Sequence, residues 1–413
     1  MLQNQISNFS EKIKNDLKKM NQWPALREIF EGLDKKNRLC WISGGAVRDL
    51  ILSRTPLDFD LTTDATEIEI LELFPQAILV GQAFGVYKIP KAGEIFDLTV
   101  FREEDEYIDG RRPVSIRRST PEKDAHRRDF TINGLYWDMK NEVLVDYVGG
   151  LQDLANQIIR CVGEPSKRFD EDYLRILRMI RFGYSLNFHI DEKSYEAGLL
   201  RANLLIRISG ERILAEILKL SVQQSRLKFY ADPLFLSIMK HNDLSLVDVS
   251  SKINLMKQTV SVEGLTENDR ILIELLFLRD FQIVHVQQLQ ARLKISHDAK
   301  KWLIKCVEIN ELIQKKSDFV QFCLLIDKSK NYLVLVHYFK TLNYLDENLF
   351  QKITETYKKF PTSMVIAQDF LTLVPVHQLS KVLIRAREWQ LRNEIEDRDL
   401  VLDHIRKQLR FDA

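Results

Sequence analysis

A glycine-rich turn followed closely by two alternating aspartates is the feature that most restricts the fold of this chain. The turn spans Gly44 to Asp49, and Asp58, Phe59 and Asp60 follow after a short gap. Side chains at positions i and i+2 of a strand point to one face, so we expect Asp58 and Asp60 to project together while Phe59 enters the core. Two neighbouring carboxylates form a platform for a divalent metal ion.

The turn itself predicts a phosphate site. Ser43, Gly44 and Gly45 let backbone N–H groups approach an anion closely, and the apolar run after Arg48 predicts a helix whose N-terminus favours negative charge. Phosphates beside Mg²⁺ indicate phosphoryl or nucleotidyl transfer. Taken singly, an Asp-x-Asp pair is often a solvated strand face and a glycine pair a simple turn. Their close succession favours the catalytic interpretation.

Size and charge suggest several domains and a locally basic surface. The chain has 413 residues, of which 45% are hydrophobic and 29% charged, which is ample for more than one packed core. Its net charge is only +1, so a nucleic-acid surface requires local clustering. Between residues 111 and 128, seven basic residues stand against two acidic ones. The candidate RNA-binding members are Arg111, Arg112, Arg117 and Arg118.

Cysteine usage and hydropathy predict a cytoplasmic protein. The four cysteines are far apart and match no disulfide framework or zinc spacing. Residues 1–20 predict an amphipathic helix rather than a signal peptide, and no run approaches the roughly twenty apolar residues that cross a bilayer. The sequence gives no sign of an obligate protein partner.

The pattern along the chain predicts an α+β fold, with a mixed-sheet domain followed by helical domains. Strands are expected at residues 39–42, 57–61, 77–79, 86–89, 95–101 and 133–138. From Asp170 onward glycine and proline become sparse and apolar residues recur at helical spacing. We predict domains at residues 1–165, 166–225 and 226–413.

A third acidic residue is a candidate for the same metal site. Asp97 lies in the alternating run 95–102, where it could face the same side as Asp58 and Asp60. Alternatively, it is a strand aspartate bonded to a neighbouring arginine. The register of a strand cannot be fixed from sequence, so both possibilities stay open.

Two further segments carry candidate nucleotide-binding residues. Arg127 and Arg128 could clamp phosphate oxygens through bidentate hydrogen bonds, and Asp129 and Asn133 suit a ribose hydroxyl. Arginine pairs are usually just solvent-exposed, but the position of this pair after the aspartates favours a clamp.

Residues 169–182 predict one helix with charged side chains every three positions. Asp172 and Arg175 are surface neighbours there and could present a hydrogen-bond acceptor beside a hydrogen-bond donor. The alternative is an ordinary intrahelical ion pair worth a few tenths of a kcal/mol. Arg178 and Arg181 continue the same repeat. A capped helix start at residues 208–217 could brace this helix through Glu211 or Arg212.

In order, these segments resemble the five motifs of the class II tRNA nucleotidyltransferases, the CCA-adding enzymes, which share a catalytic core with bacterial poly(A) polymerases. The resemblance covers about residues 38–220. It implies a head domain of the nucleotidyltransferase fold named after DNA polymerase β, followed by helical neck, body and tail domains. It also implies a protein that uses CTP, ATP and Mg²⁺ to extend a tRNA 3′ end.

The resemblance assigns a role to most of the candidate residues. Asp58 and Asp60 would hold two metal ions, whereas Asp172 and Arg175 would pair with the incoming base. The triphosphate and ribose would be read by Gly44, Gly45, Arg48, Asp49, Arg127, Arg128 and Asp129.

Base selection also follows from hydrogen-bonding chemistry. Cytosine and adenine each present an amino donor beside a ring-nitrogen acceptor, so Asp172 can accept and Arg175 can donate. With UTP both contacts would oppose like polarities, each leaving a buried polar group unpaired at about 1–3 kcal/mol.

Several functional alternatives remain at this point. Family poly(A) polymerases typically carry a doubly basic pair where this chain has residues 81–85, and the pair is missing. Enzymes of the family that add only C tend to lack a flexible loop between the first two motifs, whereas this chain has a long charged stretch there, at residues 103–120. Full CCA addition is therefore favoured over A-only or CC-only addition. The alternative from another class is a non-catalytic RNA-binding module, which would not need the carboxylates.

The resemblance also implies that the helices after residue 225 contact tRNA.

Overall fold

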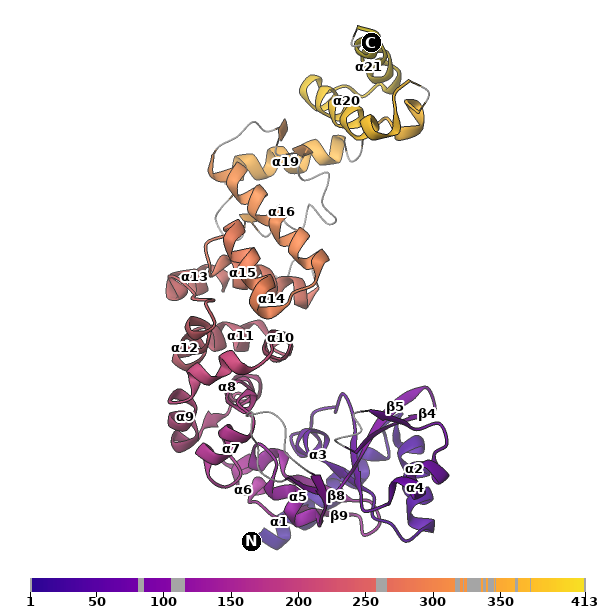
Figure 1. Ribbon diagram of the computed structural model, residues 1–413, viewed down its shortest axis with the longest axis vertical. Helices are drawn as coiled ribbons and strands as arrows, with labels where there is room; N and C mark the ends of the chain where they lie inside the picture. Colours follow the sequence, from indigo (N-terminus) through magenta and orange to yellow (C-terminus); the bar gives the residue numbers. More distant parts are fainter. Residues whose placement is uncertain are drawn as a thin grey trace. The chain divides into compact units, whose positions relative to one another are not determined.

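The protein is described here from a computed structural model (Figure 1). The structure describes residues 2–80, 85–104, 116–257 and 266–315, parts of 320–346, and 347–411 except 361, 362 and 372. The chain forms two compact units, residues 1–216 with 232–241 and residues 217–231 with 242–413. The predicted domains 1–165, 166–225 and 226–413 divide the chain differently, and their boundaries stay a prediction.

Unit 1 contains a seven-stranded mixed sheet with strand order β3-β4-β5-β2-β1-β8-β9. Strands β2 and β5 run parallel, and the other neighbours are antiparallel. The strands are β1 (Trp41–Ser43), β2 (Asp60–Thr63), β3 (Ile78–Val80), β4 (Val86–Lys91), β5 (Glu94–Val100), β8 (Leu135–Asp138) and β9 (Val143–Asp146). Two-stranded sheets pair β6 (Arg102–Glu104) with β7 (Ile116–Arg118), and β10 (Ile158–Ile159) with β11 (His189–Ile190).

The helices of unit 1 begin with α1 and end with α12. In Figure 1, α2 and α4 lie together beside the β4 and β5 end of the sheet. The helices are α1 (Leu2–Leu17), α2 (Trp23–Lys35), α3 (Gly45–Ile51), α4 (Glu67–Leu73), α5 (Pro121–His126), α6 (Gly150–Ala155), α7 (Pro165–Glu171), α8 (Leu174–Leu186), α9 (Glu192–Leu199), α10 (Gly210–Leu218) and α12 (Pro233–His241), with 3₁₀ turns at Thr131–Asn133 and Ala202–Arg207. The last two residues of α10 belong to unit 2.

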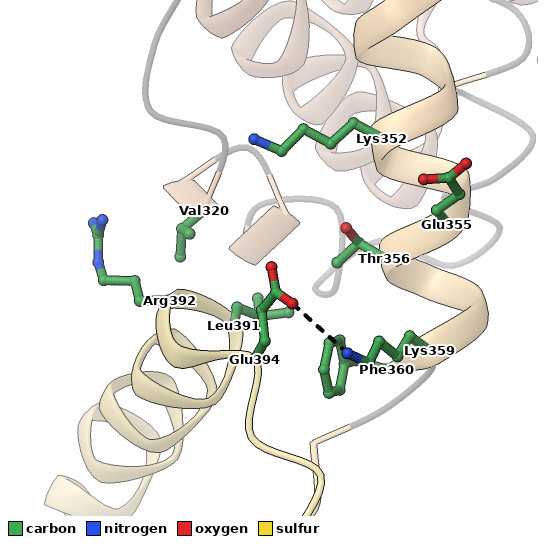
Figure 2. A pocket seen from close by; sticks show the side chains of 9 residues that line it. All are labelled: Val320, Lys352, Glu355, Thr356, Lys359, Phe360, Leu391, Arg392 and Glu394. Atoms are coloured by element: carbon green, nitrogen blue, oxygen red, sulfur yellow. Dashed lines mark ion pairs between the residues drawn. The ribbon is translucent and has the colours of Figure 1, made fainter.

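The regular secondary structure in the described part of unit 2 is helical, with loops between the helices. Its helices are α11 (Gln223–Tyr230), α13 (Val249–Met256), α14 (Glu267–Phe277), α15 (Ile283–Leu293), α16 (His297–Gln314), α19 (Glu347–Lys359), α20 (Leu379–Asn393) and α21 (Arg398–Phe411). A pocket of about 580 Å³ lies between α19 and α20, and Lys359 and Glu394 form an ion pair in it at 3.6 Å. Figure 2 shows the side chains that line it. Basic and acidic side chains both line this pocket, so it carries no strong charge of one sign.

Two local predictions from sequence need correction. Residues 169–182 form two helices, because Asp172 is extended and its carboxylate accepts the backbone N–H of Leu174 at 3.1 Å, which starts α8 anew. Strand β2 begins only at Asp60, so Asp58 precedes it. Its neighbour β1 ends at Ser43, opposite Asp60, where the chain turns into α3.

All six predicted strands are present, with bounds shifted by a few residues. Strands β6, β7, β9, β10 and β11, each of two to four residues, were not expected. Phe59 is 4% exposed and enters the core as predicted. The mixed-sheet domain followed by helices confirms the predicted fold class. No helix among the described residues is both long and apolar enough to cross a membrane.

Candidate active site

The glycine turn lies against the double arginine. Gly44 has a φ of +68°, and a Cβ at this position would stand 2.9 Å from Nη1 of Arg128. Only glycine therefore fits without displacing that guanidinium. The Gly44 N–H donates to the Leu135 carbonyl at 2.9 Å, which ties the turn to β8. Residues 44 and 128, far apart in sequence, thus meet at one end of the sheet.

Asp60, one of the two candidate metal carboxylates, lies beside the glycine turn at this same end of the sheet. Ser43 pairs in register with Asp60, and Asp60 pairs with Asp97 across the parallel strands. Partial removal from water raises the pKa of Asp60, and the nearby charge of Asp58 raises it further. The charge of Arg128 acts in the opposite direction. Two mutually repelling carboxylates with oxygen donors suit a hard divalent cation such as Mg²⁺.

For Asp97, the structure shows an ion-paired strand aspartate that lies in register with Asp60. It stands in register beside Asp60, and its carboxylate accepts a hydrogen bond from Lys88 Nζ at 2.7 Å. The basic neighbour is thus a lysine rather than an arginine. Within the described ranges, no group of three or more acidic, histidine or cysteine side chains is arranged to hold a metal ion.

A buried carboxylate that sequence reasoning overlooked holds the two arginines. Asp124 is fully buried and accepts from Arg127 at 2.7 Å, from Arg128 at 3.2 Å and from the Tyr136 hydroxyl at 2.7 Å. Burial alone would raise the pKa of Asp124, but the charges of Arg127 and Arg128 outweigh it and lower the pKa to about 2. Its position three and four residues before the arginines, within helical reach, was the available signal.

Asp129 and Asn133 link the glycine-turn helix to α8. The Asn133 amide donates to Asp129 at 3.0 Å, and its oxygen accepts from Arg48 at 2.7 Å. Arg48 also pairs with Asp49 at 2.8 Å. Arg178, on α8, pairs with Asp129 at 2.7 Å. Despite burial, that charge holds the pKa of Asp129 well below its usual range.

Asp172 and Arg175 lie where α7 gives way to α8, and each is held by another element. Arg175 pairs with Glu171 and donates to the Arg127 carbonyl at 3.1 Å. Asp172 pairs with Arg212 of α10 at 2.7 Å. The predicted brace from α10 is therefore present through Arg212.

Arg178 and Arg181 share a second brace from α10 that the sequence did not reveal. Glu216 pairs with Arg181 at 2.6 Å and with Arg178 at 3.5 Å. Arg181 is 8% exposed, and its guanidinium lies 3.9 Å from the centre of the Phe182 ring. Burial and the pairing with Glu216 leave Arg181 little surface for a nucleotide, and its nucleotide contact stays a prediction.

Of the basic cluster, the structure describes only one part. Arg117 and Arg118 lie on β7, and Arg118 donates to the Ala65 carbonyl at 2.7 Å. Arg111 and Arg112 lie outside the described residues, as do most of residues 81–85 and the centre of the stretch 103–120.

Comparison with known proteins supports the predicted resemblance. Residues 40–160 match the family model of the poly(A) polymerase head domain. A CCA-adding enzyme of Staphylococcus saprophyticus is 32% identical over 339 residues, covering 79% of this chain and 78% of that enzyme. The chain belongs to the family of CCA-adding enzymes and bacterial poly(A) polymerases.

The family contains both activities. Poly(A) polymerase I of Salmonella typhimurium is 36% identical over 52% of this chain and 50% of its own length. The structure of the Thermotoga maritima CCA-adding enzyme complexed with tRNA_CCA matches with a TM-score of 0.69 at 21% identity and covers 98% of both chains. At this identity the likeness establishes a shared fold.

Proposed function

We propose that this protein is a template-independent tRNA nucleotidyltransferase that adds CCA to tRNA 3′ ends from CTP and ATP. One observation carries the proposal: Asp60, the Gly44 turn and Arg128 meet at one end of the sheet. An acidic pair, a close-approach turn and a phosphate-binding side chain are the parts that nucleotidyl transfer requires.

The chain's own residues divide the work between triphosphate and base. Arg127 and Arg128, held by Asp124, would bind phosphate oxygens, while Asp129 and Asn133 would orient the ribose. Asp172 would accept from the base amino group and Arg175 would donate to its ring nitrogen. Braced side chains lose little freedom when the nucleotide binds, which sharpens selection against UTP.

Asp58 and Asp60 would hold Mg²⁺, which when bound neutralises phosphate charge and activates the attacking oxygen. The RNA 3′ hydroxyl would attack the nucleotide α-phosphate in line, and pyrophosphate would leave. The arginine pair would stabilise the charge on the departing phosphates.

The helices of unit 2 are proposed to contact tRNA. This rests on the family and on the described likeness to an enzyme complexed with tRNA_CCA. The basic residues Arg111, Arg112, Arg117 and Arg118 are proposed to contact the RNA near its 3′ end.

Product length separates the candidate functions. Purified protein would be incubated with tRNAs ending at the discriminator base, after one C and after two, with CTP and ATP singly and together. We expect completion of CCA on all three substrates and no product from Asp60→Asn. Long adenosine tails would indicate a poly(A) polymerase, whereas a single A only on the two-C substrate would indicate an A-adding enzyme. Binding without any product would favour an RNA-binding module.

A further inference from the structure

Three charged side chains form a row across neighbouring strands of the catalytic sheet. Lys88 on β4 pairs in register with Asp97 on β5, and Asp97 pairs in register with Asp60 on β2. Directly paired residues place their side chains on the same face of a sheet. Phe96 and Leu98, which flank Asp97, are buried on the other face. Lys88 and Asp97 keep 40% and 36% of their side chains exposed.

This row places a third carboxylate next to the proposed metal pair and supplies it with a competing cation. The Lys88 ammonium lies 2.7 Å from an Asp97 oxygen, so it uses lone pairs that a metal ion would otherwise use. The other cation near Asp60 is Arg128, which is already engaged by Asp124 and Tyr136. Lys88 is therefore the side chain that decides whether Asp97 is available.

We propose that Lys88 is a positioning residue that withholds Asp97 from the metal site, so that Asp58 and Asp60 bind divalent cations as a two-carboxylate pair. The inference rests on the proposed function, because it concerns the same metal site. Lys88 itself touches no reacting atom and acts through Asp97.

The exposure of the pair limits the size of its effect. Ion pairs that are this accessible to water contribute up to about 1 kcal/mol, which corresponds to about fivefold in a binding constant. Removing the lysine should therefore free Asp97 and tighten cation binding by about threefold to fivefold.

The test measures Mn²⁺ binding to the full chain by calorimetry, without nucleotide. We expect Lys88→Met to bind Mn²⁺ about threefold to fivefold more tightly than the parent, and Lys88→Arg to behave as the parent. Lys91→Met is the matched control, since Lys91 lies on the same strand and pairs with Glu28 at 2.5 Å. An affinity for Lys88→Met no higher than that of Lys91→Met, or no measurable binding by the parent, would overturn the proposal.

A double variant separates action through Asp97 from a general loss of positive charge. If Lys88 acts through Asp97, the gain from Lys88→Met disappears in the Asp97→Asn background. The same gain in both backgrounds would show that only the loss of positive charge matters, and would contradict the inference.

The Mg²⁺ concentration for half-maximal CTP addition should fall by the same factor in Lys88→Met. A parent that binds Mn²⁺ but adds no nucleotide would refute the proposed function, whereas an active parent with an unchanged Lys88→Met would refute only this inference.

Discussion

At the scale of single residues, the candidate site depends on carboxylates that orient arginines. Asp124, Asp129 and Glu216 are each buried and each accept from at least one arginine of the site. A buried charge is costly unless it is paired, so each such pair holds both partners in one geometry. These acids therefore set where four of the proposed nucleotide-binding side chains lie, namely Arg127, Arg128, Arg178 and Arg181.

Asp124 gives a prediction with a defined pH window. Its folded pKa of about 2 lies below the ordinary 3.8, so its stabilising contribution is present above pH 3.8 and is lost as the pH falls through about 2. The shift corresponds to about 2 kcal/mol. Asp124→Asn should lower the free energy of unfolding by at least about 2 kcal/mol at pH 7.

Urea unfolding followed by circular dichroism at pH 7, 4 and 2.5 would check this prediction. The difference between the variant and the parent should shrink as the pH falls, and the KM for nucleotide should rise because the arginines lose their anchor. Asp170→Asn is the control, since Asp170 pairs with Arg201 at the exposed surface and should cost less than about 1 kcal/mol. A pH-independent difference would contradict the assignment.

At the scale of elements, α10 braces the segment proposed to read the base. Arg212 and Glu216 lie four residues apart, so they project from one side of the helix. One pairs with Asp172 before α8, and the other pairs with Arg178 and Arg181 on it. The orientation of Asp172 therefore depends on a helix that need not contact the nucleotide.

Nucleotide selection should accordingly respond to α10. Arg212→Ala removes the partner of Asp172, and we expect UTP incorporation relative to CTP to rise about tenfold, equivalent to about 1.4 kcal/mol. Asp172→Ala should change selection in the same direction, and more than it slows overall turnover. Single-nucleotide incorporation assays would measure both. Glu211→Ala, an exposed neighbour on α10, should leave selection unchanged. Unaltered selection in Arg212→Ala would count against the brace.

At the scale of the whole molecule, the two units are stabilised in different ways. Unit 1 combines a sheet core with the arginine–carboxylate network of the site. Unit 2 is helical in its described part and contains one deeply buried ion pair, in which Arg226 donates to Glu274 at 2.6 and 2.9 Å. The Tyr230 hydroxyl also donates to Glu274, at 3.1 Å. This network joins α11 to α14.

Unit 2 should be sensitive to loss of this pair. Glu274→Gln leaves the Arg226 guanidinium buried without its carboxylate, and we expect a loss of about 3–5 kcal/mol. Glu267→Gln is the matched control, because Glu267 pairs with the same arginine but is 44% exposed. Differential scanning calorimetry, with limited proteolysis to locate the unfolded region, would measure the effect. Equal destabilisation by the two variants would contradict it.

Much of the fold and part of the site were predictable from local sequence. The glycine turn, the Asp-x-Asp and the strand runs are recognisable because backbone sterics and side-chain alternation act over a few residues. The split between α7 and α8 was missed because Asp172 resembles an ordinary helical residue until its carboxylate is seen to cap Leu174. The unexpected strands were missed because two to four residues carry too little pattern.

The sequence alone determined which chemical groups this protein has and the order in which they occur. Tertiary structure decided their partners: Asp60 beside Asp97, Lys88 on Asp97, and Arg212 on Asp172. Such pairings depend on strand register and on contacts between residues far apart in the chain, and a one-residue slip would turn each strand side chain to the other face. Only the folded chain can therefore show which charges are free to meet a nucleotide.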